Sequence, residues 1–108
     1  VQARGQIEGG VAQGLGLALL EELILTDGKI ANANFTDYLL PTAMDTPPIE
    51  IAAFIEQPEP GAPFGAKGIG EPPVISSTPA IVAAIRNATG FELNRVPVKP
   101  EDIALNGL

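Results

Sequence analysis

GQIEGGVAQGLGLALLEE, residues 5–22, has the apolar spacing of a long helix. Apolar side chains recur in it at every third or fourth position, as they do along one face of a helix. Leu17 and Leu20 add a second apolar flank. Because most sides of the predicted helix are apolar, we expect it to be largely buried.

The glycines inside this predicted helix need an explanation; they are Gly9, Gly10, Gly14 and Gly16. Each costs a helix about 1 kcal/mol relative to alanine. Such a cost is usually offset by the close approach of another backbone or of a ligand, which a side chain would prevent. Spacing alone favours tight packing of the helix on a sheet and leaves contact with a ligand as the alternative.

The residues after this helix predict a β-hairpin and further extended segments. Residues 23–26 and 29–33 flank Asp27-Gly28, a dipeptide suited to a type I′ turn. Residues 34–40 form a second extended stretch, and residues 50–57 are predicted as a strand. Ile51, Ala53 and Ile55 alternate there with Ala52, Phe54 and Glu56. Since both faces of this strand are fairly apolar, we expect it inside a sheet rather than at its edge.

The second half begins with a long irregular segment. Residues 58–73 hold five of the 11 prolines and four of the 12 glycines, and loops of this length are often functional. A second helix is predicted from Pro79, capped by Thr78, to Gly90. A short strand over 91–96 and a helical turn over 100–105 complete the chain. Together these elements predict an α+β fold, with two main helices packed on a small antiparallel or mixed sheet.

The composition excludes several classes of protein. The 108 residues, 1–108, are predicted to form one domain, and they include neither cysteine nor histidine. Disulfide, zinc-finger, iron–sulfur and Ser-His-Asp chemistry are therefore excluded within this chain, and no metal ligand is predicted. Six basic and 13 acidic residues give a net charge of −7, which argues against nucleic acid and anionic membranes as partners. No apolar run is long enough for a membrane span.

Two features predict a piece of a longer protein. The only methionine is Met44, so the chain begins without an initiator and is expected to be a cut piece or a processed product. Its apolar fraction of 45% suggests surface that other parts of a larger protein normally cover. We expect the isolated chain to self-associate through that surface.

The motif GAKGIGEPP, residues 65–73, is the most informative for function. Its three glycines, which include Gly70, let the backbone turn sharply and approach a ligand closely. Pro72 is expected to keep Glu71 out of the helical region of backbone conformation. A carboxylate held on a rigid backbone is what a general base requires. The alternative is an exposed loop glutamate near Lys67.

Gln6 is a second candidate, at the head of the glycine-rich helix. Its amide offers two donors and an acceptor, which suits recognition of the polar edge of a heterocycle. Helix capping or simple exposure is the alternative. Phosphate-binding patterns are not satisfied, because Leu19 replaces a glycine of the dinucleotide fingerprint and Ala66 replaces one of the Walker A motif.

Three motifs, in order, resemble the molybdenum-binding subunit of the molybdenum hydroxylases, the xanthine dehydrogenase/aldehyde oxidase family. GQIEGGVAQGLG at 5–16 is similar to the family's glycine-rich helix, NFTDYLLPT at 34–42 to its DYxLPT stretch, and KGIGEPP at 67–73 to its KGxGEPP loop. The resemblance spans nearly the whole chain. It implies a C-terminal fragment of a larger molybdopterin-binding domain.

The resemblance also implies roles for the candidate residues. Glu71 matches the family's active-site base, which takes a proton from the water-derived oxygen that attacks a heterocycle or aldehyde. Gln6 matches a residue that contacts the molybdopterin cofactor, and Gly70 is expected beside the same cofactor. Because the family holds molybdenum through the pterin, the absence of cysteine and histidine is no objection. The isolated chain is expected to be inactive and to retain no cofactor.

The implied partners are the rest of the subunit, iron–sulfur and flavin subunits or domains, and a small heterocyclic or aldehyde substrate. The predicted compartment is the cytoplasm, with the periplasm as the alternative. Two other functions stay open: a non-catalytic module that packs against partner chains, and a docking domain for redox partners, suggested by the charge of −7. A packing module has no need of Glu71 after KGIG, and this favours the enzyme.

Overall fold

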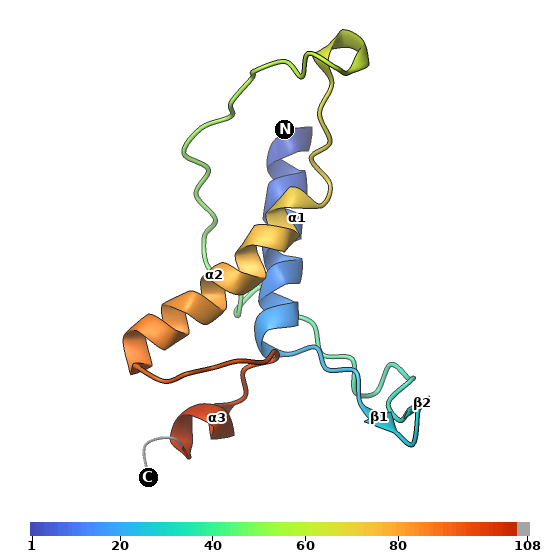
Figure 1. The fold of residues 1–108 in the computed structure, drawn as a ribbon, viewed down its shortest axis with the longest axis vertical. Helices are drawn as coiled ribbons and strands as arrows, with labels where there is room; N and C mark the ends of the chain where they lie inside the picture. The colour runs from blue at the N-terminus through green and yellow to red at the C-terminus, as the bar shows by residue number, and fades with distance from the viewer. Residues whose placement is uncertain (106–108) are drawn as a thin grey trace.

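Two long helices joined by a wide excursion of the chain form this fragment (Figure 1). The structure, a computed structural model, describes residues 1–105. In chain order the elements are α1 (Gln2–Leu19), β1 (Leu25–Thr26), β2 (Lys29–Ile30), the 3₁₀ turn η1 (Pro63–Gly65), α2 (Pro72–Thr89) and α3 (Pro100–Ala104). The prediction of two main helices and a small antiparallel sheet is confirmed. The helices pack chiefly on each other, and the hairpin projects beyond the end of α1 (Figure 1).

The two long helices run side by side in the same direction. The Gln6 amide reaches the carbonyl of Gly70, and the Thr78 hydroxyl donates to the carbonyl of Gly14 at 3.1 Å. Both pairs are separated by 64 residues, so the contacts advance along the two helices together. Helices that run in the same direction need a long return connection, and residues 20–71 provide it.

Glycine brings the backbones of α1 and α2 close together. A Cβ added at Gly10 would lie 2.6 Å from the Cβ of Pro73, and one added at Gly14 would overlap the Ser77 side chain. Gly10, Gly14 and Pro73 are buried. These two glycines are packing residues, but the predicted packing on a sheet was wrong, because the neighbour is the helix α2. The close approach of α2 offsets their cost to α1.

α1 buries one face instead of most of its surface. Its buried residues are Gly10, Gly14, Gly16 and Ala18. The expectation of a largely buried helix was wrong for this chain, because α2 is the main element packed against α1. The helix begins and ends three residues earlier than predicted, at Gln2 and Leu19.

The last turn of α1 contacts the C-terminal segment, where the N–H of Val98 donates a hydrogen bond to the carbonyl of Ala18 at 2.7 Å.

α2 begins seven residues before its predicted start. Pro72 and Pro73 occupy its first positions, where a missing N–H breaks no intrahelical bond. Thr78 therefore lies inside the helix and does not cap it, and Pro79 is an interior proline. The predicted end at Gly90 is confirmed, with the left-handed φ of 75° that glycine adopts without strain.

The hairpin turn is confirmed, whereas most of the predicted strands are not formed. Asp27 and Gly28 both have positive φ, 50° and 75°, as a type I′ turn requires. Residues 34–40 begin with turns, because the Asn34 side chain accepts a hydrogen bond from the N–H of Thr36 at 2.9 Å. Residues 50–57 and 91–96 have no strand partner in the described part of the chain.

The chain is unusually open for its size. Its radius of gyration is 17.1 Å, whereas a compact domain of this length has about 13 Å. Its accessible surface is 8363 Å², against about 5,700 Å² for a compact monomer of this mass. Among residues 1–105, the buried hydrophobic side chains are Ala18, Leu93 and Val98. No helix in that range has the length and apolar composition needed to cross a membrane.

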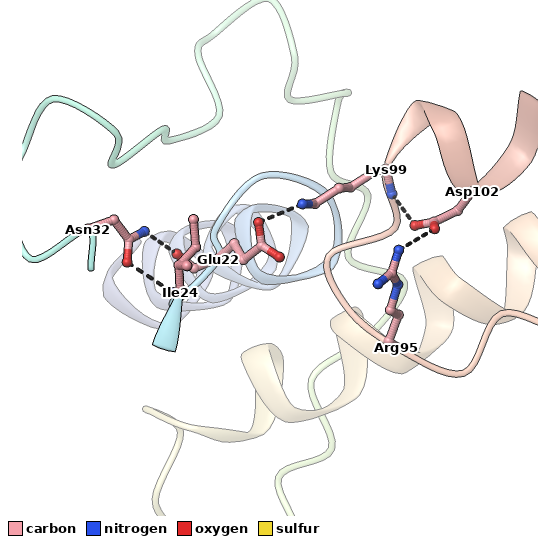
Figure 2. A network of polar contacts seen from close by, with 6 residues as sticks. All are labelled: Glu22, Ile24, Asn32, Arg95, Lys99 and Asp102. Atoms are coloured by element: carbon pink, nitrogen blue, oxygen red, sulfur yellow. Dashed lines mark hydrogen bonds and ion pairs between the residues drawn. The ribbon is translucent and has the colours of Figure 1, made fainter. Parts of the chain in front are cut away.

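Polar contacts fix the end of α1 to the hairpin and to the C-terminal segment (Figure 2). The Asn32 amide donates to the carbonyl of Glu22 at 2.7 Å and accepts from the N–H of Ile24 at 2.9 Å. The Glu22 carboxylate pairs with Lys99 Nζ at 2.6 Å. These contacts hold residues 22–24, which follow α1, against the hairpin and the C-terminal segment.

The predicted turn at the C-terminal end is confirmed as α3, with Asp102 in its first turn. The Asp102 carboxylate accepts a hydrogen bond from the N–H of Lys99 at 2.9 Å and pairs with Arg95 Nη2 at 2.6 Å (Figure 2). The backbone hydrogen bond from Lys99, together with Arg95, lowers the pKa of Asp102 below its ordinary value of 3.8.

Acidification is therefore expected to loosen the start of α3. A carboxylate whose pKa is lowered by folding stabilises the fold fully above its ordinary pKa, and this contribution is lost as the pH falls through the lower folded value. An NMR titration of the α3 amides should show this transition below pH 3.8. Asp102→Asn should abolish it, whereas Glu101→Gln, on the same turn, should leave it in place. A transition that survives Asp102→Asn would contradict the assignment.

Candidate active site

The three predicted site residues lie together beside the start of α2. The Gln6 Nε2 of α1 lies 3.5 Å from the carbonyl oxygen of Gly70, at the long limit of a hydrogen bond. Glu71 follows Gly70 directly. The structure thus joins two motifs that are 64 residues apart in the sequence.

Glu71 is the N-cap residue of α2, and its side chain is exposed. Its backbone is helical, with φ of −87° and ψ of −34°, so the expectation that Pro72 would keep it out of that region was wrong. The carbonyl of Glu71 accepts hydrogen bonds from the N–H groups of Val74 at 3.0 Å and Ile75 at 3.1 Å. These bonds outweigh the steric preference of a residue before proline, and they fix Glu71 to the first turn.

The carboxylate of Glu71 is left available for chemistry. It makes no capping hydrogen bond to α2, and it forms no ion pair with the described residues. Lys67 Nζ instead lies 3.5 Å from the carbonyl oxygen of Ile55. Because Glu71 stands at the N-terminal end of an 18-residue helix, the positive end of the helix dipole lies beside it.

Hydrogen bonds hold the backbone on both sides of the segment that carries Glu71. After it, α2 is held against α1 by the contact of Thr78 with Gly14. Before it, the loop closes on itself where the N–H of Glu59 donates to the carbonyl of Gly65 at 3.1 Å. Gly65 has a φ of 69°, and a Cβ there would lie 2.6 Å from the Cβ of Pro58. The contact of Thr78 with α1 was not predicted, because Thr78 was expected to cap the second helix.

Other glycines near this site face open space. A Cβ added at Gly5, Gly9, Gly68 or Gly70 would meet no atom within 4 Å, and none of these glycines has a positive φ. Gly5 and Gly9 lie one turn apart on α1, where each costs about 1 kcal/mol with no neighbour in the described chain to explain it. Exposed backbone beside Gln6 and Glu71 fits the close approach of a large group from outside this chain.

A large hollow in the described part of the chain lies elsewhere. It has a volume of about 730 Å³ and is formed at the far end of α1 by residues that include Leu17, Phe35, Tyr38 and Val96. Neither Gln6 nor Glu71 lines it, so we do not assign it to the substrate. Within residues 1–105, no cluster of three or more acidic, histidine or cysteine side chains could hold a metal ion.

Comparison with known proteins shows the family of the chain. A profile of the molybdopterin cofactor-binding domain matches residues 1–47. The xanthine dehydrogenase molybdenum-binding subunit of Escherichia coli O157:H7 is 42% identical over 112 residues, which cover 98% of this chain and 15% of that protein. The chain thus spans about one seventh of the length of such relatives.

Two solved structures share the fold. Quinoline 2-oxidoreductase from Pseudomonas putida 86 matches with a TM-score of 0.82 and 42% identity, over 94% of this chain and 13% of that one. The Cu,Mo-CO dehydrogenase matches with a TM-score of 0.83 and 30% identity, over 97% of this chain and 14% of that one. The fold and these matches therefore define the class of the chain as part of a molybdopterin cofactor-binding subunit. The chain belongs to the molybdenum hydroxylases, the xanthine dehydrogenase/aldehyde oxidase family.

Proposed function

We propose that this chain is the C-terminal part, a single domain, of the large subunit of a molybdenum hydroxylase. In this proposal Glu71 is the general base, and Gln6 and Gly70 belong to the pterin site. The observation that carries the proposal is the contact of Gln6 with Gly70 beside an exposed carboxylate at the start of α2. The family membership supports it, because it covers nearly the whole chain.

The proposed reaction hydroxylates an electron-poor carbon of an aromatic heterocycle or an aldehyde. When bound, the molybdopterin cofactor supplies the two-electron redox chemistry. The Glu71 carboxylate accepts a proton from water as its oxygen attacks the carbon. A C–H bond and water become C–OH, and two protons and two electrons are released. The Gln6 amide orients the pterin by hydrogen bonding, and the open glycines let it approach the backbone.

The proposal extends to partners and compartment. The rest of the subunit completes the cofactor cradle, and iron–sulfur and flavin subunits or domains carry the electrons away. The cytoplasm is the proposed compartment, with the periplasm as the alternative. Because this chain supplies only part of the cradle, the isolated chain should be inactive and should retain no cofactor.

The second candidate function is a module that only packs against partner chains. The open shape of the chain favours it, since such a surface needs a partner whether or not Glu71 reacts. The two functions differ in whether the native protein contains molybdenum and in whether it turns over a substrate.

The test uses the native protein, purified with the chains that accompany it. Elemental mass spectrometry is expected to find about one molybdenum per copy of the chain. Turnover of heterocycles and aldehydes in ¹⁸O-labelled water is expected to give labelled products. A protein without molybdenum, from a host shown to make the cofactor, would favour the packing module and refute the proposal.

A further inference from the structure

Residues 49–57, IEIAAFIEQ, are a stretch of backbone without partners. They make no backbone–backbone hydrogen bond in the described part of the chain, and one side chain, that of Lys67, reaches the carbonyl of Ile55. Figure 1 shows this stretch as an open trace that rises toward the loop before α2. Backbone N–H and C=O groups need partners when they are removed from water. A continuous row of unused groups is what a strand presents when its neighbours are absent.

The side chains of this stretch suit burial on both sides. Ile51, Ala53 and Ile55 alternate with Ala52 and Phe54, so the centre of an extended strand here would be apolar on both faces. On one of the two faces, Glu50 and Glu56 stand at the ends of this apolar centre. In this chain Phe54 is 49% exposed and Ile55 is 80% exposed. An edge strand of a half-solvated sheet has one polar face, whereas a strand with two apolar faces belongs inside a sheet that is covered on both sides.

The open shape is not peculiar to the isolated chain. The Cu,Mo-CO dehydrogenase structure matches 97% of this chain with a TM-score of 0.83, so the match includes most of residues 49–57. The matched part is 14% of that protein. The same open arrangement therefore exists where about six sevenths of the polypeptide lie outside it. The surface of this chain also exceeds that of a compact monomer by about 2,700 Å², which is the scale of an obligate interface.

We infer that residues 49–57 are an inner strand of a β-sheet whose neighbouring strands, on both sides, come from the rest of the same subunit. The occupant is thus the remaining polypeptide, and not a second copy of this chain. This inference rests on the proposed function, because it takes the remaining chain to be that of a molybdenum-binding subunit. It adds a definite interaction surface, namely the two backbone edges of one strand with an apolar layer above and below.

Hydrogen exchange in the intact subunit tests the inference without any need for molybdenum or substrate. Mass spectrometry with single-residue fragmentation should show exchange slowed by at least about 100-fold at consecutive amides of residues 50–56, relative to the denatured protein. An inner strand donates alternately to its two neighbours, so every amide is protected. Protection at alternate amides would mean an edge strand, and rapid exchange would mean no pairing; either result overturns the inference. Protection that depends on protein concentration would overturn it in favour of pairing between copies.

Proline substitution checks the two sides separately. Ala52→Pro and Ala53→Pro remove N–H groups that point to opposite neighbours, so both should lower the melting temperature of the intact subunit. Ala52→Ser and Ala53→Ser keep the N–H and serve as matched controls with smaller effects. If only one proline variant lowers the melting temperature, the strand has one neighbour and the inference fails. A protected strand in a subunit without molybdenum would preserve this inference while refuting the proposed function.

Discussion

Glu71→Gln in the intact enzyme is expected to lower kcat by about 10²- to 10⁴-fold, the usual contribution of a general base. The amide has nearly the same shape as the carboxylate but cannot accept the proton from water. The substitution should leave the fold intact, because Glu71 makes no capping hydrogen bond to α2 and is exposed. Steady-state turnover, normalised to bound molybdenum, is the measurement.

A matched control variant distinguishes the loss of the general base from the loss of one negative charge. Glu92→Gln removes the same charge from another exposed glutamate, and it should leave turnover unchanged. The molybdenum content of both variants should equal that of the unaltered enzyme. Full turnover by Glu71→Gln would refute its assignment as the base. Loss of molybdenum in Glu71→Gln would instead make Glu71 part of the cofactor cradle.

Gly14→Ala is expected to destabilise the chain by about 1–3 kcal/mol, the usual cost of overpacking a tight contact. In a helix without neighbours the same change would stabilise by about 0.5–1 kcal/mol. The difference arises because a Cβ at Gly14 would overlap the Ser77 side chain and lie 3.2 Å from the backbone nitrogen of Thr78. Urea unfolding of the chain, followed by circular dichroism, measures the change.

Two further variants test whether the overlap with Ser77 causes the loss of stability in Gly14→Ala. Gly9→Ala, on the same helix with no atom within 4 Å, should be neutral or stabilising in the isolated chain. Ser77→Gly should recover part of the loss when it is combined with Gly14→Ala, since it removes the overlapping side chain. If Gly14→Ala stabilises as much as Gly9→Ala, the close packing of α1 on α2 is refuted.

Features set by local backbone chemistry could be predicted from the sequence. Asp27-Gly28 predicts its turn because two successive positive φ angles suit these residues, and Gly90 predicts the end of α2 for a related reason. The start of α2 was missed because Pro72 and Pro73 suit a loop as well as a first helical turn. The strand over residues 50–57 was predicted from side chains, but a strand forms only where another strand lies beside it.

The candidate site, like the fold, could be predicted only in part from the sequence. The motif around Glu71 identifies the carboxylate, and its resemblance to a family supplies a role. The contact of Gln6 with Gly70 could not be derived, because no local signal specifies which residues meet across 64 positions. The helical backbone of Glu71 was also missed, since it depends on hydrogen bonds from Val74 and Ile75 that exist only if the helix begins at Pro72.

The separation of about 64 residues between α1 and the positions that it contacts in α2, and just before it, governs the order of folding. A glycine-rich helix of 18 residues is marginal alone, and the partners of α1 lie far along the chain. At ribosomal rates of 5–20 residues per second, the residues of α2 are synthesised about 3–13 s after the residues of α1 that they contact. Val98, whose N–H donates to the carbonyl of Ala18 in the last turn of α1, is synthesised later still. The nascent N-terminal segment therefore stays unpaired, and open to chaperones, until nearly the whole of this fragment has been synthesised.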